Sequence, residues 1–572
     1  MSFGGMNMKL SDFIVSFLEK KGVTDVFGYP GGMITHFMES LSHSKNIKTH
    51  LSRHEQAAAF EAVGYVKSSK KPTAVFTSSG PGATNLVTGI CDAWFDSTPV
   101  LFITGNVNTY ESRAGYNVRQ KGFQETDIIS IVSSITKFSK YIQNEYEIKD
   151  ILENAWDKMY SERKGPSLID VPMNITRAEI DTNALSFNIE KQKNSQVIDF
   201  GEIEKIINES KRPVILIGNG VHISDCEESV AKLIQKWKIP VVTSLPAVDL
   251  QHDYYPYSQG FIGAYGKRAA NIIVEKSDLI ISIGSRMDNR QIGTDSSFFA
   301  TKAKLIRFDI DNNELNVKVK SDELSYCADI RFVIDGLDKI SIKNDHSHWI
   351  YVCEKIQDTL QSFDRTDQVT FLKKIIDSLP NGSYVSTDVG QNQIWVPQAL
   401  SVQKKVRMIF SSGFGSMGFS LPAAIGAAIA NHMPVYSFNG DGGIQMNIQE
   451  LEVIVRENLP IKIIILNNSS LGMIRQFQEL YFNNNDFLTN RGHGYSCPDF
   501  EKIGNAYGIP SINANLNDVE MIQEFIKNNH YCLINIDVNN PTYLNPKSIY
   551  NKPLSHQIPE LPEEIQKYLM EL

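Results

Sequence analysis

The sequence predicts an α/β protein built from several parallel sheets, and three observations lead to this fold class. Apolar runs of strand length recur along the chain, at residues 74–77, 100–104, 167–171, 214–217, 279–283, 305–310, 434–438, 461–467 and 532–538. Runs without polar alternation are typical of parallel strands covered by helices on both faces. Amphipathic segments lie between them; in 447–457, apolar Ile448, Leu451 and Val455 recur at helical spacing. The length of 572 residues exceeds that of one ordinary domain.

Two polar stretches divide the chain. Residues 183–197 have no sustained apolar period, and a second polar stretch ends at Thr366 and Asp367. We therefore expect three domains, at residues 1–185, 186–350 and 351–572, each large enough for its own parallel sheet.

Composition argues against several classes of partner. The chain is 42% hydrophobic and 21% charged with a net charge of −9, which excludes disorder and disfavours nucleic acid or anionic lipid. Its apolar runs are too short to cross a membrane, and residues 1–10 lack the pattern of a signal peptide. The six cysteines have no metal-binding spacing, which suits a reducing compartment. We expect a cytoplasmic protein.

Polar residues follow two consecutive strands in the last third. Asp441 lies in the sequence NGDGG directly after the strand at 434–438, and Asn468 follows the strand at 461–467. Neighbouring parallel strands end at the same edge of a sheet, so these side chains should meet. Carboxylate and amide oxygens suit Mg²⁺, and glycines let backbone N–H groups approach a phosphate. For GDGG alone an ordinary turn with an Asp N-cap is the alternative; the second motif favours a site.

This arrangement resembles the signature of thiamine diphosphate (ThDP) enzymes, and its surroundings resemble the acetolactate synthase family over nearly the whole chain. The motifs are DVGQNQIW at 388–395, SSGFGSMGF at 411–419, LPAAIGA at 421–427 and LGMI at 471–474. The resemblance implies Mg²⁺ on Asp441, Asn468 and the backbone carbonyl of Ser470. It implies a ThDP contact set of Gly390, Gln391, Asn392, Gly415, Ser416, Met417, Gly442, Gly443, Asn468, Gly472 and Met473. Asn392 stands where the family commonly has His. Met417 would bend the cofactor into its V shape, the alternative being an ordinary core methionine.

The first third resembles the family's proton-holding half of the site. Glu55, in RHEQ, would hydrogen-bond the cofactor's pyrimidine, because a carboxylic acid in a dry pocket can share a proton at neutral pH; a first-turn helix acid is the alternative. SGPGATN at 79–85 also matches, and Gln124, in FQE, is implied to contact the reactants. Lys137 falls on a family lysine at the substrate entrance, with a solvated lysine as the alternative. Since Glu55 and Asp441 belong to different domains, the resemblance implies a homodimer or homotetramer with shared active sites.

The middle third resembles the family's FAD-binding domain, in which a GxG sequence follows the strand at 214–217. The implied flavin residues are Ser97, Gly218, Gly263, Gly266, Arg286, Asp288, Asp309, Ile310, Asp329, Ile330, Ser412 and Gly413. A nucleotide-free domain of the same fold is the alternative.

The chain departs from the family on the acceptor side. It has GAYG at 263–266 for GMHG, Asn289 for the second Asp of RFDDR, and Phe477 for a Trp. Arg290, implied to bind the acceptor's carboxylate, is retained. The loop between 107 and 123 looks long and carries Arg113, Arg119 and Lys121. These differences predict a roomier acceptor pocket with basic surroundings.

The resemblance implies a carboligase that decarboxylates a 2-oxo acid, pyruvate, and transfers the two-carbon unit to a second carbonyl, as acetolactate synthase does. Three alternatives stay open. The acceptor could be larger, such as a nucleotide-linked keto sugar, whose phosphates would suit the basic loop. The chain could also be a pyruvate oxidase or decarboxylase, or a non-catalytic homologue.

Overall fold

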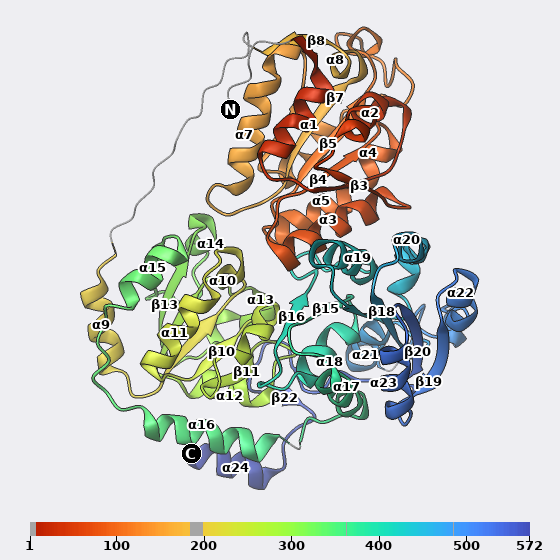
Figure 1. The fold of residues 1–572 in the computed structure, drawn as a ribbon. Coiled ribbons are helices and arrows are strands. Elements are labelled where there is room, and N and C mark those ends of the chain that lie inside the picture. The colour runs from red at the N-terminus through yellow and green to blue at the C-terminus, as the bar shows by residue number, and fades with distance from the viewer. Residues whose placement is uncertain (1–6, 183–197, 362, 484) are drawn as a thin grey trace.

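The computed structural model describes residues 7–182, 198–361, 363–483 and 485–572, and Figure 1 shows them arranged around three sheets. The N-terminal sheet has the order β3 (Lys48–Leu51), β2 (Asp25–Gly28), β4 (Ala74–Thr77), β5 (Leu101–Asn106), β7 (Ser167–Pro172) and β6 (Phe138–Tyr141). The C-terminal sheet has the order β16 (Val406–Ile409), β15 (Ser383–Thr387), β17 (Val435–Gly440), β18 (Ile461–Asn467), β20 (Cys532–Asp537) and β19 (Ser511–Asn515). The two therefore share one topology.

The middle sheet has a different topology. Its order is β11 (Ser258–Phe261), β10 (Val241–Thr243), β9 (Pro213–Ile217), β12 (Leu279–Ile283), β13 (Lys304–Asp309) and β14 (Leu324–Cys327). This is the doubly wound order in which the chain reverses direction between the first and fourth strands, β9 and β12. All strand pairs in the three sheets are parallel, and β9 and β12 are buried along their whole length. The predicted fold class is confirmed, and every predicted apolar run contains a strand.

Only one of the two expected domain boundaries falls within the described residues. The boundary at 185/186 lies outside the described residues. The boundary at 350/351 cuts α16 (Ser347–Leu360), whose Trp349, Val352 and Ile356 pack into the middle domain's core. The packing therefore assigns α16 to the middle domain, and the C-terminal domain begins near α17 (Asp367–Ser378).

The helix expected at 447–457 is shorter than the sequence indicates. A 3-10 segment, η8 (Ile444–Glu450), precedes α20 (Leu451–Arg456), and Asn447 has non-helical angles of φ −134° and ψ 32°. The Asn447 Nδ2 donates a hydrogen bond to the carbonyl of Gly418 at 2.8 Å. This side-chain bond ties the segment to a neighbouring loop and explains why the helical pattern is interrupted.

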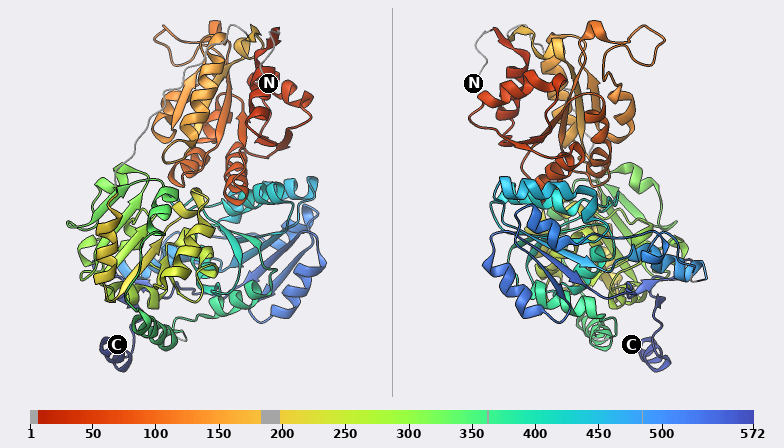
Figure 2. Two further views of the ribbon diagram at one scale, coloured as in Figure 1. Left: turned by 60° about the vertical axis from the view of Figure 1, so that its left-hand side comes forward. Right: turned by 90° about the vertical axis from the view of Figure 1, so that its right-hand side faces the viewer.

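Helices α3 (Glu55–Ser69) and α19 (Ser420–Asn431) join the N-terminal and C-terminal domains, as the views in Figure 2 show. Their backbones touch at two glycines. A Cβ at Gly64 would overlap the backbone of Ala423, and one at Gly426 would overlap the carbonyl oxygen of Glu61. Glycine is required at this crossing because the helices approach closer than any side chain allows.

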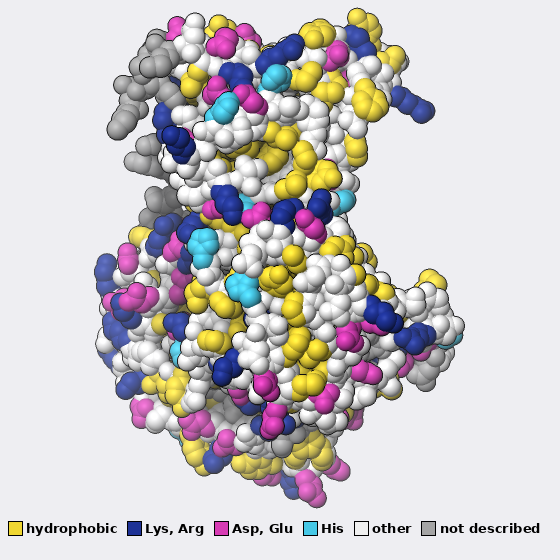
Figure 3. All heavy atoms as spheres, turned by 45° about the vertical axis from the view of Figure 1, so that its right-hand side comes forward, with side chains coloured by type: hydrophobic (Ala, Val, Ile, Leu, Met, Phe, Trp, Pro, Cys, Tyr) yellow, Lys and Arg dark blue, Asp and Glu magenta, His cyan; other side chains and the backbone are white. Residues whose placement is uncertain are grey.

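Charged side chains form a row at the waist between the two domains in Figure 3. Ion pairs cross this waist from Arg53 to Glu452 at 2.8 Å and from Lys48 to Glu457 at 3.1 Å. The same face carries hydrophobic side chains both above and below the waist. Among the described residues, no helix is long and apolar enough to span a membrane.

Candidate active site

Asp441 and Asn468 meet at the carboxyl edge of the C-terminal sheet, because β17 and β18 run side by side in parallel register. The Asp441 carboxylate accepts hydrogen bonds from the backbone N–H groups of Asn468 and Ser470. The Tyr495 hydroxyl donates to its Oδ2 at 2.8 Å. Burial nevertheless raises the pKa of Asp441 to about 6. A carboxylate withdrawn from water fits a divalent metal site, because a metal ion would compensate its lost hydration.

The side-chain amide of Asn468 is oriented by its neighbours. Its Nδ2 donates to Gln391 Oε1 at 3.0 Å and to Thr542 Oγ1 at 2.8 Å, and its Oδ1 accepts from the Ser470 N–H at 3.0 Å. A carbonyl oxygen has two lone pairs, so one remains for a metal ion. Sequence reasoning missed Thr542, which follows β20, the next strand along the same edge.

Glycines let the backbone pass close to other groups beside this pair. A Cβ at Gly443 would overlap the Asp388 carboxylate, and one at Gly472 would overlap Gln391 Oε1. A Cβ at Gly442 would lie 3.3 Å from Met417 Cε, so the tip of Met417 reaches the turn that carries Asp441. The residues implied to face a diphosphate therefore form one closely packed surface in which these positions require glycine.

Asp388 organises this surface, a role that sequence reasoning did not assign. It accepts hydrogen bonds from the backbone N–H groups of Val389 at 2.8 Å and Gly418 at 2.9 Å, and burial raises its pKa to about 7. Asn392, in place of the family's His, donates through Nδ2 to the Asp388 carbonyl at 2.7 Å. Ser416 is buried, and its Oγ has no hydrogen-bond partner among the described residues, which fits a position that a ligand completes.

The predicted ThDP contact set also includes two glycines with positive φ and one methionine. Gly390 has φ +147°, and Gly415 has φ +76°. A Cβ at Gly415 would meet no atom within 4 Å, so the space beside it is open. Met473 is half-buried and packs against the C-terminal core.

The N-terminal domain holds a separate cluster around Glu55, at the start of α3. Glu55 Oε2 accepts a hydrogen bond from Asn85 Nδ2 at 2.9 Å, and its Oε1 lies beside Gly82. Gln124 has φ +61° and packs its Cβ against Gly80 in the same turn. Glu55 and Asp441 share no hydrogen-bond partner among the described residues, so the candidate site consists of two halves on two domains.

Lys137 lies beside the segment that follows α7 (Ile148–Tyr160), where backbone carbonyls engage it. Its Nζ donates to the carbonyl oxygens of Arg163 at 2.9 Å and Ser161 at 3.3 Å, and burial lowers its pKa. Its role at a substrate entrance stays a prediction, since these bonds hold the ammonium within its own domain.

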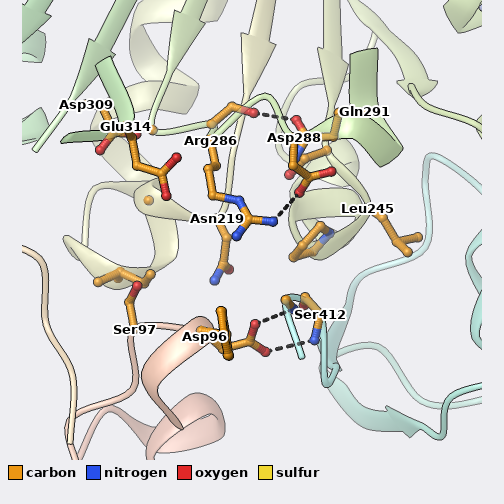
Figure 4. A pocket seen from close by; sticks show the side chains of 18 of the residues that line it. Asp96, Ser97, Asn219, Leu245, Arg286, Asp288, Gln291, Asp309, Glu314 and Ser412 are labelled. Atoms are coloured by element: carbon orange, nitrogen blue, oxygen red, sulfur yellow. Dashed lines mark hydrogen bonds and ion pairs between the residues drawn. The ribbon is translucent and has the colours of Figure 1, made fainter. Parts of the chain in front are cut away.

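A cavity of about 350 Å³ opens where the three domains meet, and Figure 4 shows it from close by. Of the predicted flavin residues, all except Gly218 line it: Ser97, Gly263, Gly266, Arg286, Asp288, Asp309, Ile310, Asp329, Ile330, Ser412 and Gly413. A Cβ at Gly218 would overlap the carbonyl of Gly284, so Gly218 instead permits the close approach of the chain after β9 to the chain after β12.

Ion pairs and backbone contacts shape this cavity. Arg286 pairs with Asp288 at 2.8 Å, and Asp96 of the N-terminal domain accepts the N–H groups of Ser412 at 2.9 Å and Gly413 at 2.7 Å from the C-terminal domain. Figure 4 shows Asp96 and Ser412 on the side of the cavity opposite Arg286.

Two lining residues had no motif to reveal them. Arg163 pairs with Glu314 at 2.7 Å across two domains, and both line the cavity. Arg163 lies in a polar loop, where the sequence alone gives no sign of a partner.

The substituted acceptor-side positions lie among aromatic rings and cations. The Arg290 guanidinium lies 6.0 Å from the ring centroid of Tyr265, and Phe477 packs against Tyr481 with centroids 4.8 Å apart. The ammonium of Lys547, a residue not predicted, lies 5.8 Å from the Phe477 centroid.

The long basic loop is organised by Glu125. The carboxylate of Glu125 accepts the N–H groups of Arg113 at 2.6 Å and Lys121 at 3.0 Å. These bonds fix the backbone of the loop, and Phe123 beside them is 78% exposed.

Comparisons with known proteins also divide the chain into three domains. Residues 8–131, 201–337 and 388–536 match the N-terminal TPP binding domain, the central domain and the C-terminal TPP binding domain of the thiamine pyrophosphate enzymes. The chain is 34% identical to acetolactate synthase isozyme 2 large subunit of Escherichia coli, covering 88% of this chain and 90% of the relative. It is 36% identical to the probable acetolactate synthase large subunit of Methanocaldococcus jannaschii, covering 88% and 87%. For the large subunit of Lactococcus lactis the identity is 34%, covering 88% and 87%.

Fold, half-sites and comparisons together define a ThDP-dependent enzyme. Within that class, the chain belongs to the acetolactate synthase large-subunit family.

Proposed function

We propose that this protein is a ThDP- and Mg²⁺-dependent carboligase that decarboxylates pyruvate and joins the two-carbon unit to a second 2-oxo acid. The observation that carries the proposal is the meeting of Asp441, Asn468 and Ser470 beside the glycine turn of Gly442 and Gly443. The names of the relatives support the acetolactate synthase reaction, and nothing in them supports a nucleotide-linked keto sugar as acceptor.

The residues of the C-terminal half would bind the cofactor. Asp441, Asn468 and the Ser470 carbonyl would hold Mg²⁺, and the N–H groups beside Gly442 and Gly443 would donate to the diphosphate. When bound, ThDP supplies a nucleophilic carbon and an electron sink for loss of CO₂. Met417, whose tip reaches Gly442, would limit the conformations that the cofactor adopts.

Glu55 would hold the proton that activates the cofactor. Asn85 fixes one carboxylate oxygen of Glu55, so the other can exchange a proton with a partner atom. Gln124, in the adjoining turn, would contact the reactants, and Arg290 would bind the carboxylate of the acceptor.

The two halves would be completed by a second copy of the chain. The partners of Glu55 belong to the N-terminal domain and those of Asp441 to the C-terminal domain. A homodimer or homotetramer in which Glu55 of one subunit faces Asp441 of another brings them together. The hydrophobic side chains exposed on both sides of the waist support such an interface.

FAD would occupy the cavity between the three domains. The support is that the residues implied for the flavin, apart from Gly218, line one cavity, beside a sheet with the dinucleotide-binding order. The purified protein should show flavin absorption bands, or gain them on addition of FAD; protein that remains colourless with added FAD would refute this assignment. No disulfide joins the six cysteines, all of which lie among the described residues, and this supports a cytoplasmic location.

Activity is tested with pyruvate, ThDP and Mg²⁺, with products identified by mass. We expect a ligated hydroxy-keto acid and CO₂; free acetaldehyde, or acetate with peroxide, would point to a decarboxylase or an oxidase. Glu55→Gln should lose at least about 100-fold in turnover, because a general acid–base group contributes that much or more. The matched control is Glu228→Gln, at an exposed position on α11 (Glu227–Trp237) that pairs with Lys232. Full activity in Glu55→Gln would overturn the proton-holding role.

A further inference from the structure

A second cavity, of about 240 Å³, lies between the middle and C-terminal domains, and none of the residues predicted for the active site lines it. Its walls come from the start of α12 (Arg268–Lys276), α16, α17 and the end of α18 (Gln391–Ala399), which lie in the lower half of Figure 1. The charged residues that line it are four cations and one carboxylate: Lys267, Arg268, Arg365, Lys373 and Asp364. The excess of positive charge in this lining contrasts with the net charge of −9 of the whole chain.

The unusual feature of this cavity is the environment of the Lys267 side chain. Its aliphatic stem lies on Gly260, where a Cβ would come 3.1 Å from Lys267 Cδ. Its ammonium has no hydrogen-bond or ion-pair partner among the described residues, and its charged neighbours Lys373 and Arg365 are cations. Burial, followed by these two cations, lowers the pKa of Lys267 to about 8. The Lys267 side chain keeps part of its solvent exposure in the cavity, so an anion entering there would pair with an ammonium that no described residue pairs.

The carboxylate in the cavity does not supply that anion. Asp364 is engaged by Arg268, whose Nε and Nη2 donate to its Oδ1 at 3.1 and 3.0 Å. Lys373 is likewise paired with Asp377 at 2.7 Å. Neither pairing reaches the Lys267 ammonium.

Helix α12 adds partial positive charge to the same place. Lys267 is its N-cap residue, without a side-chain cap hydrogen bond, and its first turn contains no acidic residue. The first N–H groups of a helix need acceptors from outside the helix. An oxyanion bound between these groups and the Lys267 ammonium would satisfy both.

A buried acceptor lines the same cavity. Gln398 Oε1 has no hydrogen-bond partner among the described residues, whereas its Nε2 donates to the carbonyl of Tyr265 at 3.2 Å. A ligand that carries a hydroxyl beside its anionic group would satisfy this oxygen.

We propose that this cavity binds a small metabolite through a phosphate or carboxylate group, with Lys267 and the N-terminus of α12 as its anion-binding groups. Both chemistries present oxygens that accept from an ammonium and from backbone N–H groups, so the two share one recognition mode.

The test is calorimetric titration of the holoenzyme, with ThDP and Mg²⁺ present so that the diphosphate-side residues are occupied. The probes are inorganic phosphate and malonate, and tighter binding of one identifies the group that the cavity prefers. Lys267→Met keeps the stem and removes the charge, and should weaken binding about tenfold or more, as loss of a charge-assisted hydrogen bond does. The matched control, Lys232→Met on exposed α11, should bind as the wild type does. Absence of binding by both probes, or equal affinity in wild type and Lys267→Met, would overturn the proposal.

A second readout needs no variant. Acetic anhydride modifies neutral amines, and at pH 8 the Lys267 amine is available, so peptide mass analysis should find it acetylated in the free holoenzyme. Saturating phosphate should protect Lys267 while leaving Lys232 reactive. Equal modification of Lys267 with and without phosphate would contradict the site.

Discussion

The N-terminal and C-terminal domains have the same strand order but carry different halves of the proposed active site. The turn after β4 leads to Gly80 and Gly82, which pack against Gln124 and Glu55. The turn after β17 carries Asp441 and Gly442, at the candidate metal position. In the proposed function, one topology thus presents a proton-holding acid in one copy and a cation and phosphate surface in the other, because the loops at the strand ends differ.

The N-terminal and C-terminal domains contact each other through helices that occupy equivalent places in the two folds. Helices α3 and α19 lie between the second and third strands of their sheets in chain order, and each contributes a glycine to the crossing. Within one chain this contact fixes the domains against each other. It does not bring Glu55 into hydrogen-bonding contact with the described partners of Asp441.

The largest effect is expected at that crossing. Gly426→Ala should destabilise the protein by about 3 kcal/mol or more, because the new methyl group would overlap the Glu61 carbonyl and force the helices apart. Denaturant unfolding measures the loss. Gly32→Ala is the control, since no atom lies within 4 Å of the added carbon. Equal stability of the two variants would refute the close packing.

The next effect concerns the pH dependence of stability, and it compares a buried carboxylate with an exposed one. Burial raises the pKa of Asp170, at β7 of the N-terminal domain, to about 7, although Thr104 donates to it at 2.6 Å. Because the folded-state pKa is above the unfolded value, its contribution to stability is complete below about pH 4 and is lost as pH rises through about 7. Between pH 5 and 8, the wild type should lose about 2 kcal/mol more than Asp170→Asn. Exposed Asp157→Asn should keep the wild-type slope; a steeper slope in Asp170→Asn would contradict the shift.

A smaller effect concerns the C-terminal half. Tyr495→Phe removes the hydroxyl that donates to Asp441, which should raise the pKa of Asp441 and weaken Mg²⁺ binding about tenfold near pH 6.5. The deficit should shrink at pH 8, where the carboxylate is ionised in both proteins. Mg²⁺ titration of ThDP-dependent activity measures this, with Tyr507→Phe as control. A deficit that grows with pH would be inconsistent with the mechanism.

The smallest effect is expected at the waist. Arg53→Ala removes an ion pair with Glu452 between partly exposed side chains, and should cost less than about 1 kcal/mol. Added salt should reduce the difference further. A loss of several kcal/mol by denaturant unfolding would show that the waist pairs hold the domains together.

The sequence could predict the place of a residue that directly follows a strand. It could not predict a contact between a residue and a segment far away in the chain. Asp441 and Asn468 were predictable because consecutive parallel strands end at one edge. Asp388, Thr542 and Arg163 were not assigned roles, because their partners come from segments far away in the chain. The interruption at Asn447 also depends on a distant carbonyl, that of Gly418, which helical periodicity does not register.

The central claim, that each active site takes Glu55 from one chain and Asp441 from another, is tested most directly by mixing two inactive variants. Glu55→Gln and Asp441→Asn are unfolded together in equal amounts, refolded, and assayed with pyruvate, ThDP and Mg²⁺. In a dimer, half of the molecules would be mixed and each would contain one intact site, so activity should recover to about one quarter of the wild-type value. Wild-type protein carried through the same refolding sets the scale. Efficient refolding of that control, with no activity in the mixture, would contradict a site shared between subunits.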